Sequence, residues 1–334
     1  MVYMAKRFSR RADIKVDRLK NWGGGEVTKR EKELLRLQLQ KEKSLIKDLK
    51  KAYSQALNDI KERIKALQAQ EQTQSKIYQL RYQQALEKQI SGIIDVLEGE
   101  NVQIISEYLI NAYETGYLGS LYVMHGYGIP LLFGIDEKKV MASVLKPIDD
   151  MTFAQRIGQN MKEFKKTIKA EISRGIANNS TYGETAKQIQ LRINESFNRS
   201  YRIANTEMGR VSSESQYDSL VKAKKQGCEI IKQWCATLDE KTRPDHAALD
   251  GQIRNIDEYF TIGKYKALHP HGFNAPEMDI SCRCTMLEKP TWALDQSELD
   301  RLKERATYYK LDKTKDFDDF KAKYLKAIEK EGNK

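Results

Sequence analysis

Two short stretches in the last third of the chain gather residue types that can do chemistry. Residues 234–252 read WCATLDEKTRPDHAALDGQ and hold a Trp, three Asp, an Arg, a His, a Cys and a Gly. About thirty residues later, DISCRCTM adds Cys282 and Cys284. Such a cluster suits a metal site, an acid–base catalyst, or the polar scaffold of a small module.

The metal hypothesis rests on His246, Cys282 and Cys284 as candidate zinc ligands. Zinc takes four nitrogen or sulfur ligands in a tetrahedron, and His269 and His271 are the other soft ligands in the region. The two cysteines are separated by one residue, so a turn or bulge is needed to direct both thiolates at one ion. The alternative is a pair of small buried thiols beside a histidine that caps a loop. Zinc is the one cofactor that the sequence suggests.

An enzymatic hypothesis uses the aspartates of the same stretch. Asp239, Asp245 and Asp250, together with His246, could hold a hard cation or supply a general base. The sequence lacks a two-metal carboxylate pattern, a nucleophile elbow and a glycine loop for phosphates. A metal-dependent enzyme acting on nucleic acid therefore stays an alternative, and the main prediction is a protein without catalytic activity.

The structural hypothesis explains the most residues of the stretch, and we favour it. Asp239 and Arg243 are expected to pair across a tight turn. Either Asp245 or Asp250 is expected to cap backbone amides, and Gly251 to supply a positive φ. A small domain with few apolar residues needs such polar contacts, because its buried backbone groups must all find partners.

Long helical patterns precede this module. Residues 28–70 contain no Pro or Gly and place apolar residues three or four apart, which predicts a long amphipathic helix. Further helices are predicted at 73–97 and 102–117. The glycine-rich stretch 115–137 predicts a turn-rich connector that can include one short strand. Together these segments form a predicted helical N-terminal region at 28–150.

Residues 151–290 are predicted to begin with helices and to end with short extended segments. A helix is expected at about 199–226. It places three charged residues on one face, as an ordinary surface ion-pair ladder: Glu207, Arg210 and Glu214. Gly227 should end that helix.

The segment 228–289 reads as a small α+β module. EIIKQWCATL, DGQIRNIDEYF and CRCTMLE are expected to be extended segments, with Trp234 anchoring the core and Cys282 and Cys284 on an adjacent strand. A charged helical tail follows at 291–334, and a basic flexible tail precedes the helices at 1–27. The predicted fold class is α+β, with a long-helix N-terminal region, a helical segment and this small C-terminal module.

The net charge of +11 is concentrated at the two ends of the chain. Residues 1–68 hold nineteen Lys/Arg against nine Asp/Glu, and residues 301–334 hold eleven against seven. This pattern suggests contact with nucleic acid or an acidic protein surface, although solvated helices rich in Lys are an alternative. Few aromatic residues lie in the basic arm, so binding to DNA should be non-specific. The candidate contact residues for DNA or an acidic protein are Lys6, Arg7, Arg10, Arg11, Lys29 and Arg30.

Nothing in the sequence predicts a membrane span or a secretory signal. The longest apolar run, at about 126–135, is too short and too rich in glycine to cross a bilayer. The basic N-terminal stretch is not followed by a hydrophobic segment. A cytoplasmic site of synthesis is therefore expected, where the four cysteines would be thiols or metal ligands rather than disulfides.

The order of these elements resembles a known family. A helix bearing RIANTEMGRV is followed by a spacer of about twenty residues, then WCATLDEKTRPDHAALDGQ, Phe260, Pro276 and DISCRCTM. This arrangement is similar to the phage Mu F-like minor head proteins of tailed bacteriophages, also called the head morphogenesis family, over about residues 150–290. The matching positions are Thr206, Glu207, Arg210, Trp234, Ala236, Thr237, Asp239, Thr242, Arg243, His246, Leu249, Asp250, Gly251, Cys282, Arg283 and Cys284.

The resemblance implies a virion component. It would be made with the portal and scaffold in the host cytoplasm, and would lie in few copies inside the head near the portal vertex. Implied partners are the portal protein, capsid or scaffold proteins and double-stranded viral DNA, in head assembly and in packaging or ejection of the genome. The family is not regarded as catalytic, which favours the structural hypothesis. A plain non-specific DNA-binding protein is a further alternative.

Overall fold

The first described helix, α2 (Lys29–Gln68), follows from the apolar stripe along its sequence. Leu45, Leu49 and Ile60 on that stripe are buried, while the remaining faces carry charges. The computed structural model describes residues 28–68, 76–178, 180–292 and 294–332. The predicted basic tail at 1–27 lies outside these residues.

The next helix, α3 (Lys76–Gly126), is a single element where the sequence predicted two helices and a connector. The predicted break before residue 102 is wrong, and so is the predicted connector over 115–126. Apolar residues keep their helical spacing through that glycine-rich stretch and are buried, among them Leu118 and Leu121. Gly116 is needed there, because a Cβ at this position would overlap Ser215 of another helix. Residues 127–136 form no strand.

Three further helices lead to the strands. They are α4 (Glu137–Leu145), α5 (Phe153–Ala177) and α6 (Tyr182–Lys225). Thr152 begins α5 with a capping box, in which its side chain and that of Gln155 each bind the other's backbone amide. The predicted helix at 199–226 is the second half of α6, and Gly227 follows it with a φ of 98°.

The chain divides into two discontinuous units. Unit 1 comprises residues 1–41, 109–149 and 206–334, and unit 2 comprises residues 42–108 and 150–205. Helices α2, α3 and α6 each contribute residues to both units. The sequence predicts residues 28–150 and residues 151–290 as separate domains. Each of these segments contributes residues to both units, so this division into domains stays a prediction.

Unit 2 consists of segments of α2, α3, α5 and α6 around an apolar core. The Tyr53 hydroxyl lies 2.8 Å from the Ser200 hydroxyl, and Asn160 donates to the Ser196 carbonyl at 2.8 Å. These buried hydrogen bonds join α2, α5 and α6 within the unit.

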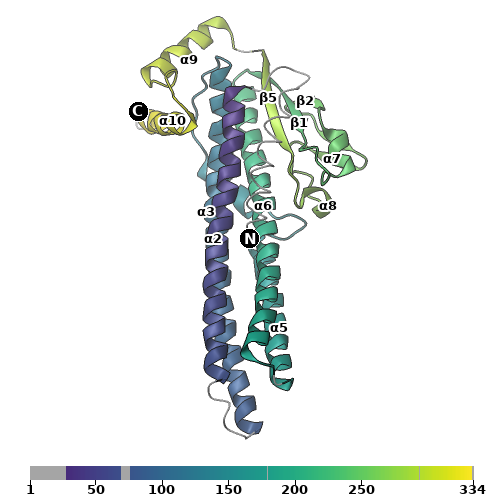
Figure 1. Cartoon of the computed structure of the whole chain (residues 1–334). Coiled ribbons are helices and arrows are strands. Elements are labelled where there is room, and N and C mark those ends of the chain that lie inside the picture. Colours follow the sequence, from purple (N-terminus) through teal and green to yellow (C-terminus); the bar gives the residue numbers. More distant parts are fainter. Residues whose placement is uncertain (1–27, 69–75, 179, 293, 333–334) are drawn as a thin grey trace. The chain divides into compact units, whose positions relative to one another are not determined.

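Unit 1 contains two small antiparallel sheets. The first has the strand order β2–β1–β5, and the second pairs β3 with β4. This sheet content after long helices confirms the predicted α+β class (Figure 1). The strand bounds are Glu229–Cys235 for β1, Ile253–Asn255 for β2, Phe260–Ile262 for β3, Tyr265–Ala267 for β4 and Thr285–Trp292 for β5. Two short helices, α7 (Pro244–Leu249) and α8 (Pro276–Asp279), lie in the connections.

The last two helices, α9 (Gln296–Tyr308) and α10 (Phe317–Gly332), are packed parts of unit 1 rather than a detached tail. Phe320 and Tyr324 on α10 are fully buried, and the Phe133 amide donates to the Tyr324 hydroxyl at 2.8 Å. Among the described helices, none combines the length and apolarity that crossing a bilayer requires.

Candidate functional site

Trp234 on β1 lies at the centre of the small module. It is fully buried, and its ring packs edge-on against Phe260 with centroids 5.2 Å apart. Phe273 lies on its other side at 5.6 Å. Leu249 and the two cysteines of DISCRCTM complete this apolar cluster. The tryptophan therefore occupies the anchoring position that the sequence predicted for it.

Asp250 and Gly251 close the loop that follows α7. The Asp250 carboxylate accepts a hydrogen bond from the Ala236 amide at 2.7 Å, which is the predicted capping of a backbone amide. Gly251 has a φ of 79°, and its amide donates to the Trp234 carbonyl at 2.9 Å. A left-handed conformation at this point lets the chain return to β1. Asp245 lies in the first turn of α7, where a negative charge suits the helix dipole.

The predicted pair between Asp239 and Arg243 is wrong. Asp239 instead forms a two-pronged ion pair with Arg283, and this guanidinium holds the pKa of the Asp239 carboxyl well below its usual value. Arg243 precedes Pro244 at the start of α7, and its side chain extends to α8. There it donates to the carbonyls of Glu277, Met278 and Ile280 at 2.6, 3.0 and 3.1 Å. The last carbonyls of a one-turn helix have no partner within the helix, so a guanidinium with several donors satisfies them.

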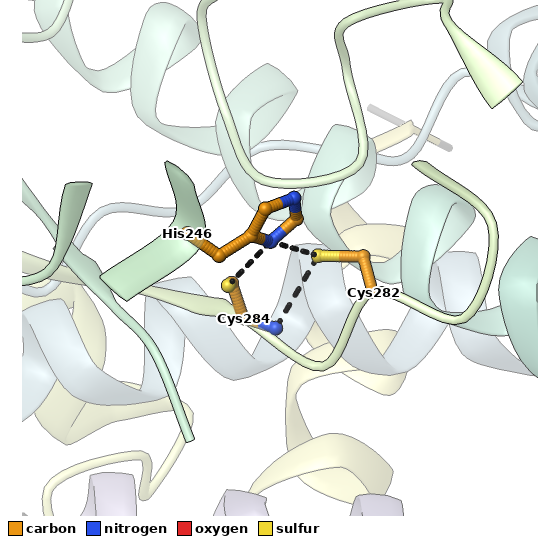
Figure 2. A group of neighbouring side chains, drawn as sticks. All are labelled: His246, Cys282 and Cys284. Atoms are coloured by element: carbon orange, nitrogen blue, oxygen red, sulfur yellow. Dashed lines mark hydrogen bonds between the residues drawn. The ribbon is translucent and has the colours of Figure 1, made fainter. Parts of the chain in front are cut away.

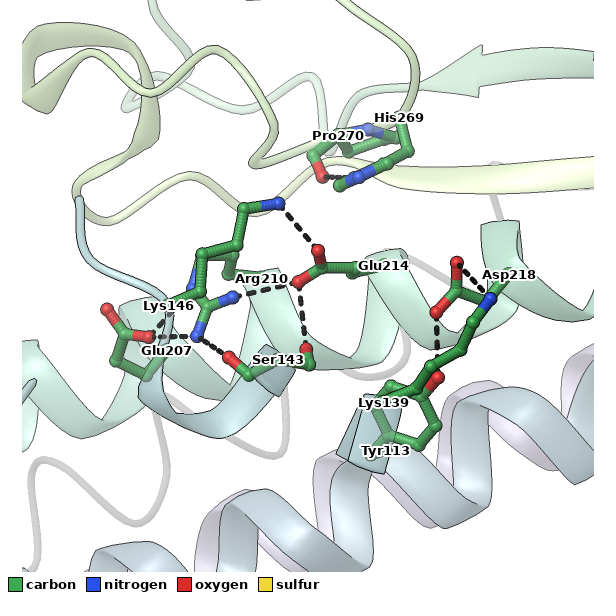
Figure 3. Close-up of polar contacts among 10 residues, drawn as sticks. All are labelled: Tyr113, Lys139, Ser143, Lys146, Glu207, Arg210, Glu214, Asp218, His269 and Pro270. Carbon is green, nitrogen blue, oxygen red and sulfur yellow. Dashed lines mark hydrogen bonds and ion pairs between the residues drawn. The ribbon is translucent and has the colours of Figure 1, made fainter. Parts of the chain in front are cut away.

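Glu207, Arg210 and Glu214 on α6 form a buried network rather than the predicted surface ladder. The Glu207 and Arg210 side chains are 0% and 3% exposed, and they pair at 2.7 Å (Figure 3). Arg210 also binds Glu214 at 2.9 Å and donates to the Ser143 carbonyl at 2.6 Å. The sequence prediction failed because α4 and the residue after it, Lys146, cover this face of α6. Burial alone would raise the pKa of Glu214, but Lys146 and Arg210 hold it below its usual value.

His246, Cys282 and Cys284 converge from two parts of the module (Figure 2). The His246 Nδ1 lies 3.3 Å from the Cys284 sulfur and 3.5 Å from the Cys282 sulfur. Both cysteines precede β5, so the predicted placement on a strand is wrong. The cysteines lie in the irregular segment between Ser281, whose φ is 57°, and β5, and there both sulfurs approach the same nitrogen of His246. The structure therefore assembles the three candidate metal ligands, each of which is buried.

The Cys282 sulfur lies in an environment that favours the thiolate. Burial alone would raise the pKa of the Cys282 thiol. The Cys284 side chain and the neighbouring His271 and His246 instead hold this pKa well below its usual value. The Cys284 amide also donates a hydrogen bond to the Cys282 sulfur at 3.4 Å. Among the described residues, the four cysteines form no disulfide.

Two other histidines of the module are buried near this cluster. The His271 Nε2 lies 3.2 Å from the Cys284 carbonyl. Its Nδ1 is buried without a hydrogen-bond partner among the described residues. His269 binds the Pro270 carbonyl, and burial lowers its pKa to about 4. A cavity of about 160 Å³ lies beside His246 and the two cysteines, with Arg243 and Arg283 in its wall.

Gly209 is a site residue that the sequence reasoning missed. A Cβ at this position would overlap the His271 ring and lie 2.8 and 2.9 Å from its two nitrogens. The glycine in RIANTEMGRV is thus the reason that the histidine fits against α6. A glycine inside a predicted helix, directly before the motif residue Arg210, was the sequence signal that could have indicated a close contact here.

The candidate contact residues in the basic arm are only partly described. Lys6, Arg7, Arg10 and Arg11 lie outside the described residues. Lys29 is exposed at the start of α2. Arg30 is half-buried, with its guanidinium 4.1 Å from the centre of the Tyr122 ring and a hydrogen bond to the Tyr122 carbonyl. Of these two described residues, Lys29 is therefore the better candidate for a contact outside the chain.

The second half of α5, all of α6 and most of the small module match a known protein family. Residues 166–287 match the model of the family described as Phage Mu protein F like protein. The chain therefore carries a phage Mu F-like domain, and the resemblance predicted from its motifs is confirmed.

Two curated relatives share more of the chain. The chain is 29% identical over 191 residues to Minor head protein GP7 of Bacillus phage SPP1, an alignment that covers 56% of this chain and 61% of the relative. It is also 29% identical over 270 residues to NAD(+)--arginine ADP-ribosyltransferase EFV of Enterococcus faecalis, which covers 79% of this chain and 55% of that relative. The chain thus spans little more than half the length of these relatives. No solved structure matches the chain significantly.

Proposed function

We propose that this chain is a minor head protein of a tailed bacteriophage. The observation that carries the proposal is that the segment with the buried motif residues is the segment that matches the phage Mu F-like family. The similarity to the SPP1 minor head protein supports the same conclusion. The protein would act with the portal in head assembly, and in the packaging or ejection of viral DNA.

The contacts of the motif residues support a binding role rather than catalysis. Arg243 is engaged by backbone carbonyls, Asp250 by a backbone amide and Asp239 by Arg283. A catalytic group must instead face a bound substrate within hydrogen-bond reach. We propose that these side chains hold the module in shape so that its surface can bind other head proteins.

The proposed partners are the portal protein, capsid or scaffold proteins, and double-stranded viral DNA. The location would be the inside of the head near the portal vertex, with assembly in the host cytoplasm. Contact with DNA would be non-specific, because lysines and arginines bind phosphates without reading the bases.

The portal proposal is tested with the full chain and the portal protein of the same phage. Co-expression followed by affinity purification should recover both, and mass spectrometry should detect the chain in purified particles. A chain that is absent from particles and does not copurify with the portal would refute the proposal. Co-expression of the chain with the capsid protein alone is the control for non-specific binding among head proteins.

The DNA proposal predicts a change in salt dependence. Reversing four charges of the arm (Lys6, Arg7, Arg10 and Arg11 to Glu) removes up to four phosphate contacts. The slope of log K against log salt should become shallower by roughly 3 to 4. A matched control reverses four exposed charges of unit 2: Lys162, Lys166, Lys187 and Arg199. Equal slopes for wild type, arm variant and control, measured by fluorescence anisotropy, would contradict a role for the arm.

A second candidate function follows from the similarity to an arginine ADP-ribosyltransferase. That alignment leaves 45% of the relative uncovered, so the named activity need not reside in the shared part. We propose that this chain does not catalyse the reaction. Incubation with labelled NAD⁺ and an arginine-rich acceptor should give no transfer above that of a heat-denatured sample. Transfer by the folded chain would establish an enzyme instead.

A further inference from the structure

The two distances from the His246 Nδ1 to the cysteine sulfurs are close to the N–S edges of a zinc tetrahedron, and all three ligand atoms lie within 4.8 Å of one another. With Zn–S at about 2.3 Å and Zn–N at about 2.05 Å, a tetrahedral angle places N and S about 3.6 Å apart. The observed separations from the His246 Nδ1 are 3.3 Å to the Cys284 sulfur and 3.5 Å to the Cys282 sulfur. The three atoms therefore lie close to zinc-ligand positions before any rearrangement.

The two sulfurs also compete for one nitrogen of His246. The three residues are between 2% and 4% exposed. The His246 Nδ1 faces two sulfurs, and a single N–H can donate well to only one of them. A cation between the three atoms would bind both sulfurs and the ring nitrogen at once.

His271 has the hydrogen-bond geometry of a zinc-binding histidine. A ligating imidazole usually donates its second N–H to a carbonyl or a carboxylate, which leaves the other nitrogen as the ligand. The His271 Nε2 lies 3.2 Å from the Cys284 carbonyl, and its Nδ1 is buried without a partner among the described residues. The ring interacts with the Cys282 thiol, so it lies beside the same cluster.

We propose that His246, Cys282 and Cys284 bind one Zn²⁺, and that His271 completes the tetrahedron after a small movement of its ring. The site is independent of the proposed partners in the phage head. Zn²⁺ would bind both sulfurs as thiolates, so that two Zn–S bonds form and each sulfur that is still protonated releases its H⁺. With all four positions filled by protein, the ion would be structural rather than catalytic.

Such an ion would join elements that are far apart in the sequence. His246 lies on α7 and the cysteines precede β5, while His271 belongs to the loop between β4 and α8. Gly209 on α6 provides the space for the His271 ring. Zinc would therefore link α7 to the loop that holds His271 and to the segment that holds the cysteines, next to the Trp234 ring.

The direct test uses the full wild-type chain and needs no variant. The purified protein is treated with a chelator, given one equivalent of Zn²⁺ and dialysed, and its metal content is measured. One zinc per chain is expected, and X-ray absorption at the zinc edge should show two sulfur and two nitrogen neighbours. A chain that retains less than a tenth of an equivalent, or a zinc surrounded only by oxygen and nitrogen, would overturn the proposal.

Variants assign the ligands. Cys282→Ser and Cys284→Ser should each lose most of the zinc, while the matched control Cys235→Ser should keep one equivalent. Co²⁺ in place of Zn²⁺ adds a readout, because thiolate ligands give an intense near-ultraviolet charge-transfer band. Circular dichroism identifies any variant that fails to fold, and the absorption experiment on the wild type then decides. Equal zinc content in all three folded variants would refute the assignment.

His271 is tested by removal and by replacement. His271→Ala should weaken zinc binding by roughly 10- to 100-fold, by analogy with the loss of other supporting contacts. His271→Cys supplies another soft ligand and should recover part of the affinity. An unchanged affinity in His271→Ala would exclude this residue as the fourth ligand.

Discussion

At the scale of single residues, the charged side chains of the module serve mainly to satisfy its backbone. Arg243 binds carbonyls at the end of α8, and Asp250 binds the Ala236 amide. Buried or half-buried backbone groups are costly when unpaired, and this module has few regular strands to pair them. The polar residues of the motif are therefore explained by the irregular path of the chain.

Replacing Arg243 should destabilise unit 1 in a graded way. Arg243→Ala leaves several carbonyls without donors and should lower the free energy of unfolding by about 2 kcal/mol. Arg243→Lys keeps the charge but loses the forked donors, so a loss of about 1 kcal/mol is expected. Urea unfolding measures both values. Arg301→Lys on α9, where the side chain is 75% exposed, is the control and should change stability by less than about 0.5 kcal/mol. Equal stability of all three variants would show that the carbonyl contacts contribute nothing.

Glu288 on β5 should make stability depend on pH. Burial, together with Glu31, raises the pKa of Glu288 to about 8, whereas the unfolded side chain titrates near 4.3. Between these values the unfolded chain has released the proton and the folded chain has not. The contribution of this carboxyl to stability should therefore be fully present below about pH 4 and be lost as pH rises to 8, by at most about 1.4 kcal/mol per pH unit.

The variant Glu288→Gln should remove this decline, so that its stability relative to wild type increases from pH 5 to pH 8. Glu304→Gln, at an exposed position on α9, should follow the wild-type curve. Unfolding by urea at several pH values provides the measurement. Parallel curves for wild type and Glu288→Gln would mean that the buried carboxyl does not titrate as expected.

At the scale of elements, the sequence predicted the presence of helices and strands more accurately than the residues at which they begin and end. Periodic apolar residues identified α2, and β-branched and aromatic residues identified β1, because these patterns are local. The continuity of α3 past residue 115 could not be read in the same way. It depends on Gly116 meeting α6, which is a contact between residues about a hundred positions apart.

The side-chain partners in the candidate site show the same limit. The sequence brought together Asp239 and Arg243 because they are close along the chain, yet Asp239 pairs with Arg283. The sequence predicted that Arg210 lies on the surface, because no residue near it in the sequence indicates that α4 packs over it. The metal cluster was predicted as a set of residue types. The irregular segment before β5, which lets both sulfurs approach His246, could only be stated as a requirement.

Glycine substitutions test the packing of α6 against the module. Gly209→Ala should destabilise the protein by about 1–3 kcal/mol, because the new methyl group overlaps the buried His271 ring. Gly99→Ala on α3 is the matched control, since no atom lies within 4 Å of the new Cβ. There the better helix propensity of alanine should stabilise by up to about 1 kcal/mol. Thermal unfolding should show opposite signs, and the same sign for both would refute the role given to Gly209.

At the scale of the whole molecule, unit 1 is built from segments distant in sequence. Phe320 on α10 packs against Tyr122 and His125 near the end of α3, with ring centroids 5.1 and 4.9 Å apart. Because residues 301–334 are rich in charged side chains, the sequence did not predict that Phe320 and its neighbours on α10 would be buried. The C-terminal helix therefore belongs to the core of the unit.

Removing one ring from this contact should be costly. Phe320→Ala should lower the free energy of unfolding by about 3–5 kcal/mol, because the fully buried ring leaves a cavity. Tyr308→Ala on α9 is the control, since this ring is 72% exposed. Calorimetry measures both. A loss of less than about 1 kcal/mol for Phe320→Ala would mean that α10 is not an integral part of unit 1.

The packing of α10 on α3 also has a consequence for biosynthesis. Phe320 and Tyr324 are synthesised nearly two hundred residues after the end of α3 at Gly126. Until then, the end of α3 lacks its aromatic neighbours, and nascent chains expose that apolar surface to chaperones and proteases. Products that terminate before Phe320 should therefore be degraded rather than accumulate.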